Sequence, residues 1–396
     1  MKVILIICCF IAHVALSQDY WELKDSINGP PRAGMASFVL GNRGYVVGGI
    51  KADGNTRKMY SYSQAQNDWD DETPLGNNPI YNISGGGLER NLACAFQVYG
   101  KGYVCLGEGE GSGYMNDLWE YDKNTQVWTQ KANFIGSARR GASSFVINNV
   151  AYVGTGEDSQ GLCDDFYSYD AAENMWHAIS SFPGGARRQA VGFELNGYGW
   201  IATGDAGVLK RDLWSYNVVT DQWQQKSNLP GNARLGAVAW STSPSAYIAT
   251  GQDATGVFLN DVWQYNYYQN SWSPKNIYIG GGRVNATAFV INGTAYLGGG
   301  YNGTYLDDFY SYHGVAAIQE EASSFILYPN PSVSWIKIDG LDGPTAYTIF
   351  SASGTLVSAG ITSSHESIST ENLAKGAYII ALSGQHNTVC RSFIKH

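Results

Sequence analysis

The chain has 396 residues, a formal net charge of −9, 13% aromatic residues, only 15% charged residues and 48 glycines. An acidic balance argues against a nucleic-acid partner, which normally requires a basic face. The aromatic and glycine content is typical of many short strands joined by tight turns, and it excludes a disordered or coiled-coil chain.

Residues 1–17 have the pattern of a signal peptide. Lys2 gives a positive start, an apolar run follows, and Ala15 and Ser17 place small residues before a cut at Gln18. The apolar run is too short to span a membrane as a helix, and the sequence holds no later apolar stretch of about 18 residues. We therefore expect an exported mature protein with no transmembrane span; an uncleaved anchor is the alternative.

Two aromatic patterns recur with a period of 40 to 50 residues. An aromatic-x-Tyr dyad occurs six times: Tyr60–Tyr62, Trp119–Tyr121, Tyr167–Tyr169, Trp214–Tyr216, Trp263–Tyr265 and Tyr310–Tyr312. A Trp follows seven residues after each of the first five dyads: Trp69, Trp128, Trp176, Trp223 and Trp272. Such self-similarity is the mark of a repeat architecture.

A second pattern of arginine, aromatic residues and glycine precedes each dyad. Each unit begins with an arginine: Arg32, Arg90, Arg139, Arg187, Arg234 and Arg283. Seventeen residues later comes a glycine: Gly49, Gly107, Gly156, Gly204, Gly251 and Gly300. Between them lie two aromatic positions, such as Phe145 and Tyr152 in the third unit. Six copies in one register indicate six structurally equivalent units.

Each unit is predicted to form four short strands. In the third unit, residues 141–147 and 151–154 are apolar, rich in β-branched and aromatic residues, and separated by the turn Asn148-Asn149. Residues 165–169 supply a third strand, and Trp176 begins a fourth. A four-stranded sheet cannot bury both faces alone, so stacking against neighbouring sheets and radial closure are expected.

The two ends of the repeat region complement each other. The sixth unit lacks a Trp after its dyad, whereas Trp21 stands eleven residues before Arg32. Trp128, Trp176, Trp223 and Trp272 likewise stand eleven residues before their own arginines. Residues 20–24 are therefore predicted to be the outer strand of the last unit, which closes the ring.

The order of arginine, paired strands ending in glycine, Asp-x-aromatic-x-Tyr and Trp resembles the kelch repeat, and the resemblance covers residues 18–314. It implies an all-β, six-bladed kelch-type β-propeller closed by an N-terminal strand. The first unit departs from the repeat, because the spacing from Trp69 to Arg90 is 21 residues rather than 11. The extra residues lie within Asp70–Gly87 and include Tyr81. They form either a binding loop or a tolerated insertion.

The region downstream of a plain linker at residues 315–323 has a different pattern. Residues 324–396 hold a Tyr-Pro-Asn-Pro element at 328–331, Leu373-x-x-Gly376-x-Tyr378 and a terminal Phe-Ile-Lys at 393–395. They resemble the C-terminal sorting domain of the type IX secretion system of Bacteroidetes. The resemblance implies a small β-sandwich read by that machinery, with release from the cell or display on its outer surface. An accessory β-sandwich without a sorting role is the alternative.

Four cysteines remain after the signal peptide: Cys94, Cys105, Cys163 and Cys390. Their spacing matches no zinc pattern. Cys94 and Cys105 fall on neighbouring strands of one hairpin, where counting places them diagonally. Two buried free thiols and a disulfide both remain open.

The candidate binding site is one mouth of the central channel. Strand one begins, and strand two ends, on the same rim of a propeller, so the six repeat arginines should converge there. The loops after the glycines add carboxylates, including Glu108, Glu157, Asp205 and Asp253. We predict a ligand-binding set of Arg32, Arg90, Arg139, Arg187, Arg234, Arg283, Glu108, Glu157, Asp205, Asp253 and Tyr81. The alternative is a salt-bridge network between blades. The aspartates before the dyads (Asp117, Asp165, Asp212, Asp261 and Asp308) are expected to cap turns.

These features favour a secreted or surface module that binds a glycan or a protein. A carbohydrate-active enzyme is the alternative, because sialic-acid-mutarotase-like isomerases are six-bladed kelch propellers that work with arginines and carboxylates at one mouth. Copper chemistry of the galactose-oxidase kind needs paired histidines, and the propeller offers only His177 and His313. Lys58 replaces the repeated aspartate in the first unit, so no metal ring is implied. We expect no metal or cofactor.

Overall fold

The computed structural model describes residues 19–77, 88–111, 113–314, 326–341, 343–351, 356–383 and 388–396. The signal peptide expected at 1–17, the linker expected at 315–323 and Tyr81 lie outside these residues. All regular elements in the described part are β-strands, and it contains no helix long and apolar enough to cross a membrane. The chain divides into two compact units, Met1–Gly314 and Val315–His396.

Six four-stranded antiparallel sheets, here called blades, form the first unit. Blade 1 contains β2 (Ala36–Leu40), β3 (Arg43–Val47), β6 (Met59–Ser63) and β7 (Asp68–Glu72); blade 2 contains β8 (Cys94–Val98), β9 (Lys101–Cys105), β12 (Leu118–Asp122) and β13 (Val127–Gln130); blade 3 contains β15 (Ser143–Ile147), β16 (Val150–Gly154), β19 (Phe166–Asp170) and β20 (Met175–Ile179). Blade 4 contains β21 (Val191–Leu195), β22 (Tyr198–Ala202), β23 (Leu213–Asn217) and β24 (Gln222–Lys226); blade 5 contains β26 (Val238–Thr242), β27 (Ser245–Ala249), β29 (Val262–Asn266) and β30 (Ser271–Lys275); blade 6 contains β31 (Thr287–Ile291), β32 (Thr294–Tyr301), β33 (Tyr305–His313) and β1 (Tyr20–Lys24).

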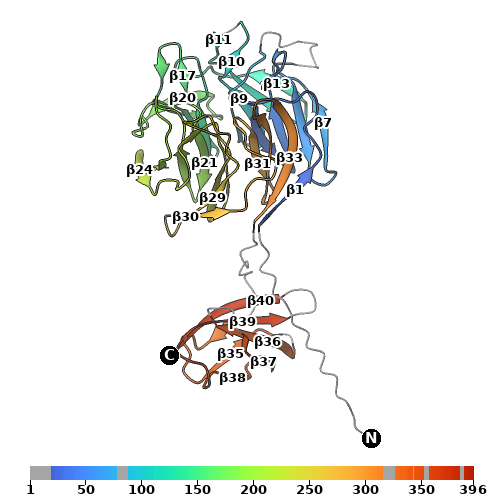
Figure 1. Ribbon diagram of the computed structural model, residues 1–396, viewed down its shortest axis with the longest axis vertical. Coiled ribbons are helices and arrows are strands. Elements are labelled where there is room, and N and C mark those ends of the chain that lie inside the picture. The colour runs from blue at the N-terminus through green and yellow to red at the C-terminus, as the bar shows by residue number, and fades with distance from the viewer. Residues whose placement is uncertain are drawn as a thin grey trace. The chain divides into compact units, whose positions relative to one another are not determined.

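The blades form a closed ring. The first strands β2, β8, β15, β21, β26 and β31 contact one another in this order, and β31 also contacts β2. The blue strand β1 lies beside the orange strand β33 (Figure 1), and Trp21 is directly opposite Tyr312 in their register. This arrangement confirms the predicted kelch-type propeller and its closure by the N-terminal strand.

The repeated Trp residues tie each blade to the preceding one. In every blade the indole N–H of the outer-strand Trp donates to a backbone carbonyl that follows the outer strand of the preceding blade. The pairs are Trp69–Asp25, Trp128–Thr73, Trp176–Ala132, Trp223–Ser180, Trp272–Ser227 and Trp21–Asn276. Trp21 thus completes the set, which explains why this residue type recurs at one register position.

The repeated glycines tie each blade to the following one. The backbone N–H of each glycine donates to the carbonyl of the next repeat arginine, from Gly49 to Arg90 and finally from Gly300 back to Arg32. All six glycines have φ between 96° and 104°, where a side chain would be strained. The glycine is repeated because the chain must turn sharply while its backbone lies against the next blade.

Cys94 and Cys105 correct the sequence-based register. They are directly opposite in the β8–β9 ladder, not diagonal. The hairpin turns on only two residues, Tyr99 and Gly100, because Val98 pairs with Lys101. Counting misplaced this tight turn, so the predicted diagonal arrangement was wrong.

The second unit contains two antiparallel sheets that share one core. One sheet contains β34 (Ile326–Tyr328), β35 (Trp335–Asp339) and β38 (Ser367–Ser369); the other contains β37 (Leu356–Thr362), β36 (Thr345–Ser351), β39 (Gly376–Ser383) and β40 (Thr388–Lys395). Ile336 and Ile368 of the first sheet pack with Ile349 and Phe393 of the second. The motif residues serve this fold, since the Asn330 side chain accepts a hydrogen bond from the Ile394 N–H and the Tyr378 hydroxyl donates to Ala374.

Candidate binding site at the channel mouth

The six repeat arginines lie inside the blades. Their exposed fractions are 0–2%. In five blades the guanidinium group makes a bidentate ion pair with the aspartate that precedes the aromatic dyad of the same blade. For Arg187 and Asp212 the two N–O distances are 2.7 and 2.8 Å. The pairs are Arg90–Asp117, Arg139–Asp165, Arg187–Asp212, Arg234–Asp261 and Arg283–Asp308. The guanidinium donors that were expected to bind a ligand carboxylate are therefore already bonded to an aspartate of the same blade.

Backbone carbonyls occupy the other donors of these arginines. The Nε group of each arginine donates to the carbonyl two residues upstream. In the five paired blades one terminal nitrogen also donates to the carbonyl 16 residues downstream, at the end of strand two. The aspartates therefore hold the arginines instead of capping turns, and the ion pairs lie within blades rather than between them. Buried charges that are paired and fully hydrogen-bonded are typical of structural roles.

Blade 1 departs from this arrangement. Its aspartate position is occupied by Lys58, which is exposed, and among the described residues no carboxylate forms an ion pair with Arg32. The Arg32 guanidinium instead stacks over the Tyr60 ring at 4.6 Å and donates to the Asn28 and Pro30 carbonyls. Arg139, Arg187 and Arg283 make comparable cation–π contacts in addition to their ion pairs, so blade 1 keeps the aromatic contact and lacks the aspartate.

A closed belt of backbone hydrogen bonds surrounds the channel two residues after each arginine. Its members are Gly34, Leu92, Gly141, Gln189, Gly236 and Asn285; each N–H donates to the carbonyl of the member in the preceding blade, at 2.7–3.1 Å, and Gly34 donates to Asn285. All six have φ between 50° and 66°. The Gln189 side chain also donates to the Asn285 carboxamide oxygen at 2.7 Å. The belt sets a narrow floor beneath the mouth, around a hollow of about 120 Å³.

Above this belt, each blade presents one pair of residues on the same backbone frame. The residue after each repeat arginine bridges, in antiparallel fashion, to the residue after each repeat glycine. These six pairs, which we call the mouth ring, are Ala33–Ile50, Asn91–Glu108, Arg140–Glu157, Arg188–Asp205, Leu235–Gln252 and Val284–Tyr301. The short ribbons β14 (Arg139–Arg140) with β17 (Glu157–Asp158), and β25 (Arg234–Leu235) with β28 (Gln252–Asp253), belong to it. The frame repeats six times, but the side chains do not.

Blades 2 to 4 carry a continuous charged arc on the mouth ring. Arg140 donates to Glu108 of blade 2 and to Glu157 of its own blade. Arg188 donates to the same Glu157 oxygen at 2.7 Å and to Asp205 at 3.1 Å. Three carboxylates and two guanidinium groups thus alternate along the rim, each Arg bridging two blades. This charged arc is half-buried and faces the mouth, unlike the repeat arginines.

The ion pairs keep Glu157 charged. Burial alone would raise the pKa of Glu157, but hydrogen bonds from Arg188 and Arg140 outweigh it and lower the pKa. Burial likewise opposes the charge on Arg140, and its bonds to Glu108 and Glu157 nevertheless raise its pKa. Glu157 and Arg140 therefore carry opposite charges at neutral pH.

The opposite side of the mouth ring carries no charged side chain and is mostly apolar. Blades 5, 6 and 1 contribute Leu235, Val284, Tyr301, Ala33 and Ile50, together with the polar Gln252. A hollow of about 590 Å³ opens here between the loops of blades 6 and 1, and Tyr301, Thr304, Tyr305 and Ala52 also line it. The rings of Tyr301 and Tyr305 are 5.2 Å apart, and Phe258 meets Tyr301 edge-on. A volume of this size is within the range of small-molecule sites.

Two family models match the chain. The model described as KLHDC2/KLHL20/DRC7 Kelch-repeats domain matches residues 28–195, and the model described as Secretion system C-terminal sorting domain matches residues 326–396. The chain contains a kelch-repeat domain and a C-terminal secretion sorting domain. No curated protein matches it. The kelch match spans blades 1 to 3 and reaches the first strand of blade 4. The sorting domain indicates type IX export, either to the cell surface or into the medium.

The kelch propeller brings together only some of the predicted site residues. Glu108, Glu157 and Asp205 share the arc with Arg140 and Arg188. Asp253 lies outside the arc, at the end of β28 in blade 5, where it accepts hydrogen bonds from Asn232 and Thr255. The six repeat arginines are withdrawn into the blades, and Tyr81 lies outside the described residues.

Sequence reasoning missed Arg140, Arg188, Tyr301 and Tyr305. The signal was present in the repeat. The position directly after the repeat arginine reads Ala, Asn, Arg, Arg, Leu and Val through blades 1 to 6. Such variation at a fixed register position marks a side chain that the kelch fold does not prescribe. The Arg doublets at 139–140 and 187–188 were therefore one scaffold residue followed by one rim residue.

Proposed function

We propose that this secreted kelch propeller is a binding module and that its ligand, a glycan, docks on the mouth ring at the border between the charged arc and the apolar hollow. The observation that carries the proposal is the break in sixfold symmetry. The same backbone frame carries charged side chains in blades 2 to 4 and uncharged, mostly apolar side chains in blades 5, 6 and 1. A sugar has the matching character, with C–H faces for tyrosine rings and hydroxyls for carboxylates and guanidinium groups.

Binding is favoured over general acid catalysis by Glu157, because this carboxylate stays charged. A general acid at neutral pH needs a carboxyl group with a raised pKa, whereas the pKa of Glu157 is lowered. A sugar isomerase of the mutarotase kind is the second candidate, because arginine and carboxylate side chains do meet at the mouth. Anomer exchange followed by NMR on any bound sugar distinguishes an isomerase from a binder.

The test is a glycan array with the full secreted chain, followed by calorimetry on the glycans retained. Replacing Tyr301 by Ala should weaken binding about two- to tenfold, since an aromatic contact contributes about 0.5–1.5 kcal/mol. Tyr268→Ala is the matched control, because Tyr268 is 77% exposed at the turn between β29 and β30, on the rim opposite the mouth. Equal binding by wild type and Tyr301→Ala would contradict the proposed site.

A further inference from the structure

Cys94 and Cys105 of blade 2 form a cross-strand pair in the core. They are directly opposite in the β8–β9 register, and their exposed fractions are 4% and 0%. Residues directly opposite in an antiparallel ladder have Cα atoms about 4.5–5.5 Å apart. A disulfide requires Cα atoms about 4.4–6.8 Å apart, so this backbone geometry already suits the bond.

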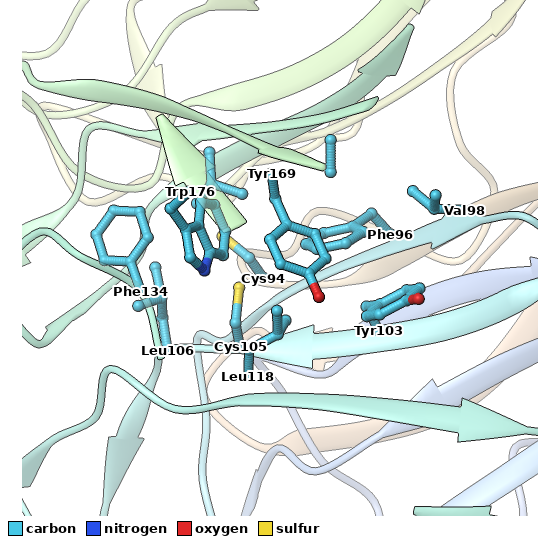
Figure 2. Packing of buried hydrophobic residues seen from close by; sticks show 12 residues of the cluster. Cys94, Phe96, Val98, Tyr103, Cys105, Leu106, Leu118, Phe134, Tyr169 and Trp176 are labelled. Atoms are coloured by element: carbon cyan, nitrogen blue, oxygen red, sulfur yellow. The ribbon is translucent and has the colours of Figure 1, made fainter. Parts of the chain in front are cut away.

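The two side chains also lie close to each other. Figure 2 shows Cys94 and Cys105 among Trp176, Phe134 and Leu118, and all five residues belong to one buried cluster. Both cysteines are free thiols in the structure, and Cys94 Sγ donates to the Ala142 carbonyl of blade 3 at 3.2 Å, a contact that disulfide formation would replace. Burial, followed by contact with Cys94, raises the pKa of the Cys105 thiol well above its usual range. A buried thiol of this kind reacts slowly once the blade has closed.

The route of export supplies the chemical setting. Type IX export takes the chain to the cell surface or into the medium, and disulfides form and persist in such oxidising compartments. We propose that Cys94 and Cys105 are joined by a disulfide in the exported protein and that the bond forms before blade 2 is fully packed.

The reaction needs a disulfide-bearing thiol oxidant of the compartment beyond the cytoplasm. One cysteine thiolate attacks a sulfur of the oxidant, the oxidant's S–S bond breaks, and a mixed disulfide forms. The second cysteine loses its proton and attacks the mixed disulfide, so the Cys94–Cys105 bond forms and the oxidant leaves as a dithiol. Two electrons and two protons pass to the oxidant.

Tryptic mapping tests the bond directly. The exported full-length protein is denatured without reductant, in the presence of an alkylating reagent that blocks free thiols, and is then digested with trypsin. Cleavage after Arg90, Lys101 and Lys123 places Cys94 and Cys105 on separate peptides. We expect these two peptides to migrate as one linked species that separates only on reduction. Free, alkylated Cys94 and Cys105 peptides in the unreduced sample would overturn the proposal. Cys163, on a third peptide, serves as the internal control for alkylation.

A stability measurement gives a second readout. Reductant should lower the melting temperature of the wild-type protein by a few degrees, because the bond closes a short loop and restricts the unfolded chain. The double variant Cys94→Ala/Cys105→Ala should show no shift with reductant, whereas Cys163→Ala should keep the wild-type shift. A shift that persists in the double variant would assign it elsewhere and overturn the proposal.

Discussion

Blades 2 to 4 contain two sets of Arg–carboxylate pairs, those of the repeat arginines and those of the charged arc. The two sets lie within a few residues of each other in the sequence, but they differ in burial and in how many blades contain them. The repeat arginines occur in all six blades, and five of them make the same bidentate ion pair with an aspartate of their own blade. The charged arc occurs only in blades 2 to 4 and links different blades through Arg140 and Arg188. The same chemistry therefore serves the scaffold where it repeats and is buried, and marks a candidate site where it varies and faces the mouth.

The largest expected effect is the loss of a repeat arginine. Arg187→Leu leaves the Asp212 side chain, which is only 15% exposed, without its ion-pair partner and removes the bond to the Thr203 carbonyl. Breaking a buried ion pair from one side costs about 3–5 kcal/mol, so urea unfolding should show a loss of that order. Arg188→Leu, the same substitution one residue later, should cost less than about 1 kcal/mol. Equal losses in the two variants would erase the distinction between scaffold and rim.

Acid should weaken the buried set. Burial opposes ionisation of Asp261, but the bonds and charge of Arg234 prevail, so its pKa is lowered. A lowered folded-state pKa gives stability that is present above the unfolded value, about 3.9, and is lost as pH falls through the folded value. Wild-type stability should therefore decline below about pH 4. Asp261→Asn should be less stable at pH 7, with a shallower acid decline; an unchanged slope would mean that this pair does not govern acid unfolding.

Sequence patterns predicted the propeller because the repeated Trp and the repeated Gly each make the same hydrogen bond to the backbone of a neighbouring blade. Trp128 reaches a carbonyl of the preceding blade, and Gly107 needs a positive φ to donate to Arg139. Residues with such roles recur at one register and can be read without coordinates. The direction of an arginine side chain cannot be read that way. It depends on tertiary packing: Arg187 is buried and paired with Asp212 of its own blade, whereas Arg188 is 30% exposed and bridges to Glu157 of blade 3.

Cys94 and Cys105 show a second limit of the sequence. Their pairing depends on a turn of two residues, and one residue more or less would have separated them. Lys58, by contrast, carried a usable signal, because the one blade without the aspartate is the blade whose arginine lacks the ion pair. A departure from the repeat at one position, such as Lys58, can therefore indicate which residue the repeated aspartate pairs with in the other blades.

A smaller effect is expected from restoring the pair in blade 1. Lys58→Asp should place a carboxylate beside the Arg32 guanidinium and raise the free energy of unfolding by about 1 kcal/mol, the typical net value of a hydrogen-bonded pair. Lys58→Asn is the matched control, since it removes the lysine without adding a charge. If both variants have the same stability, the aspartates in the other blades contribute less to the fold than their geometry implies.

The smallest effect on stability is expected for Arg188→Leu at the mouth ring. This variant should change glycan affinity more than it changes the free energy of unfolding. In Arg188→Leu, Glu157 keeps its bond to Arg140, and Asp205 keeps the hydrogen bond from the Gly207 N–H, so no carboxylate is stranded. The side chain of Arg188 is 30% exposed, and water replaces its lost contacts. The arc nevertheless loses one of its two positive charges beside Glu157, and glycan affinity should change several-fold with unfolding nearly unchanged. Calorimetry and urea unfolding on the same protein separate the two quantities. A variant that loses stability but binds normally would place Arg188 with the scaffold and remove the charged arc from the proposed site.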